Sequence, residues 1–127
     1  MTGKQERPTE SEVEILSVLW TKGPSTVRDV HTELQKNRDV GYTTVLKLMQ
    51  IMSAKDLLLR DDSQRSHIYR PRQKVAKTKK KLVKHMLSRV FSGPVEDLVV
   101  QALSAKKATP EELAQIRRML DELEDQE

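Results

Sequence analysis

The chain has 127 residues, of which 36% are hydrophobic and 33% are charged, and its formal net charge is +4. This length and composition describe one or two small domains and exclude an enzyme with a large core. There is no cysteine, which excludes disulfides and thiolate metal sites, and the three histidines are too scattered for metal-ligand spacing, so we expect no metal and no cofactor.

The N-terminal segment, MTGKQERPTES, lacks an apolar core of the length that a signal peptide requires. Nowhere in the chain do about 18 apolar residues run together, as a membrane-spanning helix requires. We therefore expect a cytoplasmic protein without membrane insertion.

The first predicted helix begins at a capping box, in which the Thr9 hydroxyl and the Glu12 carboxylate satisfy each other's free amide donors. A cation, a glycine and a proline at Lys22-Gly23-Pro24 end this helix. Its broad apolar stripe consists of Val13, Ile15, Leu16, Leu19 and Trp20. We interpret Trp20 as a core residue.

A second predicted helix is capped by Ser25 or Thr26. Its inward-facing residues are Val27, Val30 and Leu34. Arg28, at the start of this helix, is either a phosphate contact or a solvated surface residue. Turn-forming residues then lead to Gly41, where a third helix begins.

The third predicted helix has one apolar and one polar face. Its apolar residues recur at i, i+3, i+4 and i+7: Val45, Leu48, Met49 and Met52. The residues that point the other way are Thr43, Lys47, Gln50 and Ala54. Short, polar and cationic side chains let this face approach a polyanion and offer hydroxyl, amide and ammonium groups to base edges and phosphates. The alternative is the ordinary solvated face of a surface helix.

A β-hairpin is predicted next, because an apolar run over 57–61 and a second short run over 67–70 flank the turn residues Asp62-Ser63-Gln64. Its basic residues are Arg60, Arg65, Arg70 and Arg72, with Ser66 and His67 near the tip. Three helices and a hairpin in about 70 residues are typical of one winged helix-turn-helix domain.

The rest of the chain predicts three further helices. A long apolar stripe after Pro71 is broken at Ser92-Gly93-Pro94, where Pro94 suits the first turn of a shorter helix. Thr109-Pro110-Glu111-Glu112 opens the last helix with a capping box and a proline at its first position. The fold class is therefore mainly α with a small β-hairpin: a winged-helix domain over 1–72 and a helical domain over 73–127.

These last helices carry more apolar surface than about 55 residues can bury in a core of their own. We expect a second copy of the chain to cover it, through Leu82, Met86, Val90, Leu98, Leu113, Ile116, Leu120 and Leu123, of which the last four form a coiled-coil-like seam. The alternative is that the helices fold back onto the winged-helix domain. If the third helix binds DNA, a two-fold dimer presents two copies of that helix to two half-sites of the duplex. The DNA sequence that it binds, the operator, must then be near-palindromic.

Charge is distributed unevenly along the chain. From Arg60 to Phe91 there are eleven Lys or Arg against two Asp, and from Thr109 to Glu127 there are seven acidic residues against two Arg. The basic part adjoins the third helix and the hairpin, which favours nucleic acid as the partner there. The lysines of 77–84 are either a solvated helix face or a patch that contacts phosphate.

For a DNA complex we expect Thr43, Thr44 and Lys47, with Gln50 as a weaker candidate, to enter the major groove. The predicted hairpin, which is the wing of such a domain, would hold the DNA backbone through Arg65, Ser66 and His67. The Thr44 hydroxyl either contacts phosphate or bonds back within its helix. Tyr42 either stacks on sugar or packs on the second helix.

Four blocks together resemble one known family: PTESEVEILSVLW, STVRDVHTEL, GYTTVLKLMQIM and HIYRP. They are similar, in order and spacing, to the penicillinase-repressor family of bacterial transcription regulators, the BlaI/MecI type. The resemblance implies a dimeric winged-helix repressor that binds palindromic operator DNA, with an N-terminal DNA-binding domain and a C-terminal helical dimerisation domain. Repression would be steric, because the dimer occupies a promoter.

The resemblance also suggests how DNA is released. In the best-known members, a cut at an Asn-Phe bond in the dimerisation domain follows detection of a β-lactam by a membrane sensor. The corresponding bond here is Gln101–Ala102, which departs from Asn-Phe. The resemblance thus suggests proteolytic release and a membrane sensor-protease system as partner, while these residues leave the cleavage and the inducing signal open.

Two other classes of function remain alternatives. A nonspecific architectural DNA-binding protein would use the lysine-rich helix and bind random duplex as well as any operator. A protein-interaction module would use the leucine seam to bind a foreign helix and would not bind duplex DNA at moderate salt. An enzyme is not expected, because the chain has no carboxylate pair, no nucleophile with a base and no glycine-rich phosphate loop.

Overall fold

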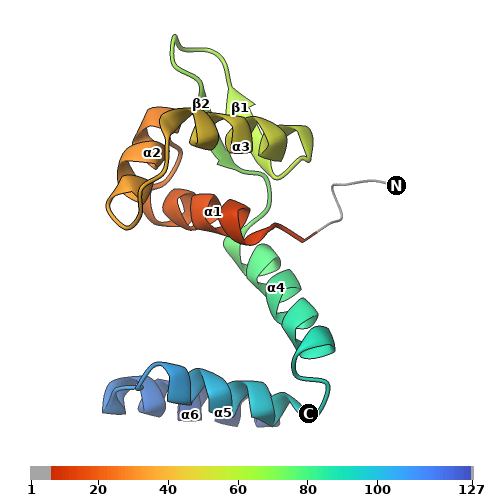
Figure 1. The fold of residues 1–127 in the computed structure, drawn as a ribbon. Coiled ribbons are helices and arrows are strands. Elements are labelled where there is room, and N and C mark those ends of the chain that lie inside the picture. The colour runs from red at the N-terminus through yellow and green to blue at the C-terminus, as the bar shows by residue number, and fades with distance from the viewer. Residues whose placement is uncertain (1–6, 127) are drawn as a thin grey trace. The chain divides into compact units, whose positions relative to one another are not determined.

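The computed structural model describes residues 7–126 and has, over that range, six helices and one antiparallel hairpin (Figure 1). The elements are α1 (Glu10–Lys22), α2 (Val27–Gln35), α3 (Tyr42–Ala54), β1 (Leu58–Asp61), β2 (Ile68–Pro71), α4 (Val75–Arg89), α5 (Val95–Ala105) and α6 (Pro110–Asp125). The predicted fold class, mainly helical with one small hairpin, is confirmed. Contacts divide the chain into a first unit that ends at Leu82 and a second unit that begins at Val83.

Capping boxes set the starts of three helices. The predicted box of Thr9 with Glu12 begins α1, and that of Thr109 with Glu112 begins α6. Of the two candidates for α2, Thr26 is the cap, and its partner is Asp29. Each box satisfies amide donors that a helix start otherwise leaves without an intrahelical partner.

Ser25 has a different role, because its backbone forms a bridge with Tyr69 of β2. The Ser25 N–H donates to the Tyr69 carbonyl at 3.0 Å, and the Tyr69 N–H donates to the Ser25 carbonyl at 2.8 Å. This bridge ties the connection between α1 and α2 to the hairpin. Pro94 occupies the N-cap position of α5, one residue before the first turn in which we expected it.

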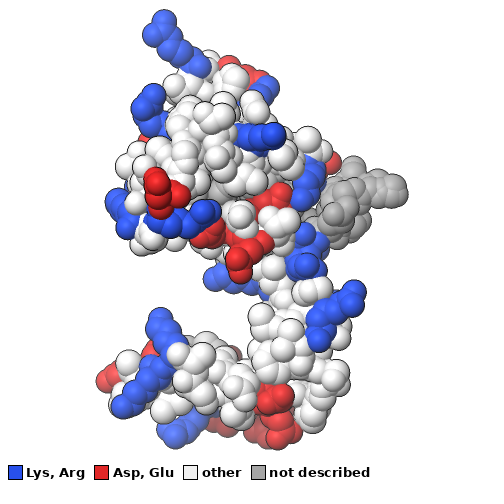
Figure 2. Space-filling view, viewed as in Figure 1, with Lys and Arg blue, Asp and Glu red and all other residues white. Residues whose placement is uncertain are grey.

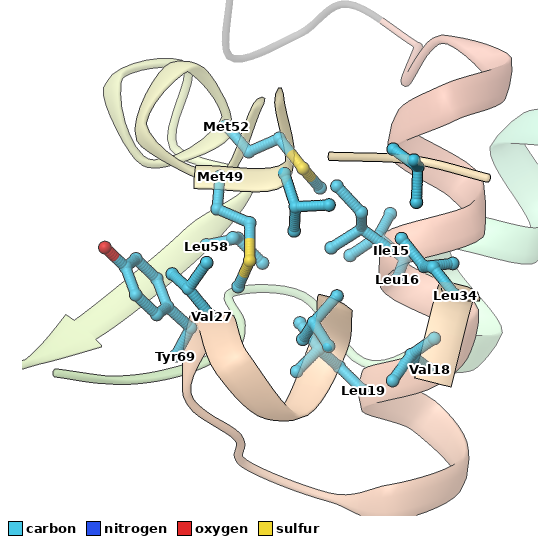
Figure 3. Close-up of a cluster of buried hydrophobic side chains, with 13 residues drawn as sticks. Ile15, Leu16, Val18, Leu19, Val27, Leu34, Met49, Met52, Leu58 and Tyr69 are labelled. Carbon is cyan, nitrogen blue, oxygen red and sulfur yellow. The ribbon is translucent and has the colours of Figure 1, made fainter. Parts of the chain in front are cut away.

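The core of the first unit lies between α1, α2, α3 and the hairpin (Figure 3). Its buried apolar residues are Ile15, Leu16, Val18, Leu19, Val27, Val30, Leu34, Val40, Val45, Met49, Met52, Leu58 and Tyr69. The inward faces predicted for the second and third helices are therefore correct, although Leu48 is only partly buried against this core. Trp20 also packs on it, as predicted for a core residue.

The hairpin pairs Leu58 with Pro71 at its base and Asp61 with Ile68 near its loop. Leu58 and Tyr69 anchor it in the core, and the loop projects beyond α3 on the side away from α1 (Figure 1). The first unit therefore has a helix and a protruding hairpin side by side, as in a winged helix.

The second unit contains no buried residue between Val83 and Gln126, which is the part of it that the structure describes. Several large apolar side chains are instead more than half exposed, including Val90 at 70%, Leu120 at 55% and Leu123 at 58%. No described helix is long and apolar enough to cross a lipid bilayer. The second unit thus carries apolar surface that its own fold leaves uncovered.

Candidate nucleic-acid interface

One face of α3 is free of contacts with the core. Thr43, Thr44, Lys47 and Gln50 are all exposed there. The opposite face is fixed by the fully buried Val45, Met49 and Met52. The N-cap residue Gly41 provides no side-chain hydrogen bond, so the free amides of the first turn stay open to an anion. This geometry suits a helix that inserts into a groove of DNA.

Tyr42 opens α3 and packs on α2, which is one of the two roles expected for it. The Arg28 guanidinium lies 5.7 Å from the centre of the Tyr42 ring, and the His31 ring meets it edge-on at 5.8 Å. His31 is itself oriented, because its Nε2–H donates to the Val40 carbonyl at 2.8 Å. Tyr42 therefore holds the Arg28 cation beside the start of α3.

A hollow of about 240 Å³ lies where α2, α3 and the hairpin meet. Four of the predicted DNA-binding residues line it, although they come from three separate parts of the sequence: Arg28, Tyr42, Ser66 and His67. A hydroxyl, an imidazole and a guanidinium in one hollow beside two helix starts are the groups that hold a phosphate oxygen. Thr26 and Leu46, which sequence reasoning missed, also line this hollow.

The hairpin is less basic than its arginines suggested. Arg60 forms an ion pair with Asp62, with Nε 2.7 Å from Oδ1 and Nη2 3.1 Å from Oδ2. This hydrogen bond raises the pKa of the Arg60 guanidinium. Figure 2 shows acidic as well as basic side chains at the hairpin end of the first unit. Arg60 and Asp62 are only two positions apart at the end of β1, and this short spacing is visible in the sequence.

Asp61, the other carboxylate of the hairpin, organises the loop. Its Oδ1 accepts a hydrogen bond from the Ser63 N–H at 2.9 Å. That hydrogen bond lowers the pKa of the Asp61 carboxyl. Arg65 and Ser66 are exposed in the loop that this turn starts.

The end of α3 is tied to the start of α1 by a buried ion pair. Lys55 Nζ donates to Glu12 at 3.0 Å and 2.9 Å, and the Glu12 side chain is only 3% exposed. The Thr9 N–H donates to the same carboxylate at 2.9 Å. Glu12 thus serves a capping box and positions the helix that carries Lys47.

The lysines of 77–84 all lie on α4. Within the first unit, Lys79 Nζ lies 5.6 Å from the centre of the Trp20 ring, so this lysine is directed at α1. Lys77 and Lys80 are exposed, and the buried Thr78 fixes this turn of the helix. The exposed lysines fit both alternatives, a solvated helix face and a patch that contacts phosphate.

The predicted dimerisation residues divide by exposure. Leu82, Leu98, Leu113 and Ile116 are partly buried, whereas Met86, Val90, Leu120 and Leu123 are exposed. Gln101 and Ala102 lie inside the regular helix α5, and both are exposed. Among the described residues, no group of three or more His, Cys, Asp or Glu is arranged to hold a metal ion.

The similarity to known proteins extends over nearly the whole chain. The family model described as penicillinase repressor matches residues 8–122. A penicillinase repressor of Staphylococcus aureus is 22% identical over 123 residues, which are 97% of this chain and 98% of that protein. The methicillin resistance regulatory protein MecI of Mammaliicoccus sciuri is 21% identical over 121 residues, 95% of this chain and 98% of that protein.

Similarity is higher over a shorter stretch in a third relative. The transcriptional regulator BlaI of Mycobacterium tuberculosis is 38% identical over 69 residues, which are 54% of this chain and 50% of that protein. The first two matches therefore include both units of the chain, and the third is limited to about half of it.

Proposed function

Because this chain belongs to the penicillinase repressor family, we propose that it represses transcription by binding a near-palindromic operator in duplex DNA as a homodimer. The observation that carries the proposal is the free polar face of α3 beside the hairpin, with Arg28, Tyr42, Ser66 and His67 converging on one hollow between them. Base contacts and backbone contacts are thereby available from the same side of the first unit.

In the proposed complex, α3 enters the major groove and the hairpin follows the backbone. Thr43, Lys47 and Gln50 offer a hydroxyl, an ammonium group and an amide to base edges, and Thr44 is placed toward the flanking phosphate. The hollow holds a backbone phosphate through Arg28 and the tip residues Ser66 and His67. Arg65 adds an exposed cation at the loop.

Dimerisation is supported by the uncovered apolar surface of the second unit. A folded segment with no buried residue from Val83 to Gln126 gains little stability from the hydrophobic effect. A second copy supplies the same apolar surface in a two-fold arrangement, and each copy then reads one half-site. The acidic residues of α6 keep the second unit from competing for DNA.

For release of DNA we propose proteolysis within the second unit, at or near Gln101–Ala102. The exposure of both residues on α5 supports this. We expect limited proteolysis with a nonspecific protease to cut the second unit first and to leave a first-unit fragment that mass spectrometry detects. A first cut inside residues 10–71 would contradict this expectation.

Selection of genomic fragments by the purified chain, followed by a competition assay, tests the function. The expected result is enrichment of sequences with two-fold symmetry, which random duplex at a large excess does not displace. Equal competition by random duplex would instead indicate an architectural protein. Absence of binding at moderate salt would indicate a protein-interaction module.

Replacement of Lys47 with Ala is expected to weaken operator binding by about 1 to 3 kcal/mol without loss of stability, because the side chain is exposed on the face of α3 opposite the core. Lys107→Ala, which removes the same charge between α5 and α6, is the matched control. Operator titrations and thermal melts measure both effects. Unchanged operator affinity of the Lys47 variant would exclude Lys47 from base readout.

A further inference from the structure

Asp62 lies between Arg60 and His67, on the surface that is proposed to face a polyanion. Its Oδ1 is 2.7 Å from Arg60 Nε and 3.7 Å from His67 Nε2, and its Oδ2 accepts from Arg60 Nη2 at 3.1 Å. The turn itself is held by Asp61 and Ser63, so the loop geometry does not require Asp62. Its contacts are with groups that can bind phosphate.

These contacts are open to exchange. The side chains of Arg60, Asp62 and His67 are 42%, 53% and 45% exposed, so water screens the pairs. Exposed ion pairs contribute little to stability, and a phosphate oxygen offers a guanidinium the same charge and hydrogen-bond geometry as a carboxylate. Arg60 can therefore exchange Asp62 for the DNA backbone at little cost to the fold.

His67 links this pair to the hollow between α2, α3 and the hairpin, because it lines that hollow together with Arg28 and Ser66. The carboxylate of Asp62 thus lies at the edge of the proposed phosphate site. A negative charge at that point repels any phosphate that is not held closely enough to displace it.

We propose that Asp62 is a specificity-determining residue, which occupies Arg60 and His67 in the free protein as an internal substitute for phosphate. The inference rests on the proposed function. Nonspecific binding derives almost entirely from protein cations that neutralise DNA phosphates. When Asp62 occupies Arg60, this cation is not available to random duplex, and nonspecific binding is weaker. On the operator, base contacts by α3 fix the register and bring a phosphate to the wing that replaces the carboxylate.

Asp62→Asn tests the inference, because it removes the charge and keeps the shape of the side chain. For random duplex we expect binding to tighten by about 3- to 10-fold and the slope of log affinity against log salt to steepen by about 0.9, which corresponds to one more phosphate contact. Operator binding is expected to tighten less, so that the ratio of operator to random affinity falls.

Two further variants distinguish the occupation of Arg60 by Asp62 from a general effect of the protein's net charge on DNA binding. Asp125→Asn makes the same charge change at the end of α6 and is expected to leave both affinities and the salt slope unchanged. Addition of Arg60→Gln to Asp62→Asn should return the salt slope to the wild-type value. Thermal melts of all variants confirm that the hairpin stays folded.

The inference is overturned if Asp62→Asn leaves random-duplex affinity and salt slope at wild-type values, if it tightens both DNAs equally, or if Asp125→Asn reproduces its effect. Failure of the proposed function is a separate outcome, in which the wild-type chain prefers no operator over random duplex. The salt slope of Asp62→Asn on random duplex then still decides whether Asp62 masks the wing.

Discussion

Leu120→Asp is expected to convert the proposed dimer to monomers and to lower operator affinity by about 10²- to 10⁴-fold, because the two half-sites are then bound independently. Leu120 is 55% exposed on α6, next to Met119 at 50% and close to Leu123 at 58%. If a second chain covers this surface, the aspartate places an unpaired charge in an apolar interface. The first unit, whose buried core lies within residues 15–69, should remain folded.

Sedimentation velocity measures the change of mass, and an operator titration at the same protein concentration measures the change of affinity. Gln115→Asp is the matched control, since it adds the same charge to an exposed position of the same helix. An intact dimer of the Leu120 variant would show that this part of α6 lies outside the interface. A monomer that retains full operator affinity would instead refute the need for two half-sites.

Local signals explain why most of the fold could be predicted. A capping box is made by residues three positions apart, so Thr9 and Thr109 mark the starts of α1 and α6 without knowledge of the rest of the structure. The inward face of α3 follows in the same way from helical periodicity. The choice between Ser25 and Thr26 as the cap of α2 could not be made locally, because it depends on the bridge between Ser25 and Tyr69.

The candidate site was predicted as a set of residues but not as an arrangement. Arg28, Tyr42 and His67 come from α2, α3 and the hairpin loop, and only the tertiary fold brings them to one hollow. The pair of Glu12 and Lys55 spans 43 positions and has no signal in either segment. Asp62 is different, since its short spacing from Arg60 was visible in the sequence, but Asp62 was interpreted only as a turn residue.

The second large effect is expected from Lys55→Met, which breaks the buried pair between α1 and the end of α3. The Glu12 carboxylate, 3% exposed, would keep the hydrogen bond from the Thr9 N–H and lose both hydrogen bonds from Lys55. Removal of one member of a buried pair typically costs about 3 to 5 kcal/mol, because the other charge stays desolvated. The Lys55 side chain is 24% exposed, so water reaches the site and the expected loss lies near the lower value.

Chemical denaturation at one fixed protein concentration measures this loss, since the proposed dimerisation would make stability depend on concentration. Glu14→Gln is the control, because it breaks the pair of Glu14 and Arg38, whose side chains are 41% and 45% exposed, and it should cost less than about 1 kcal/mol. Glu12→Gln together with Lys55→Met should recover part of the loss, because no buried charge is then left unpaired. Equal losses for Lys55→Met and Glu14→Gln would show that burial adds nothing to this ion pair, and α3 would then depend on its apolar face alone for its position on α1.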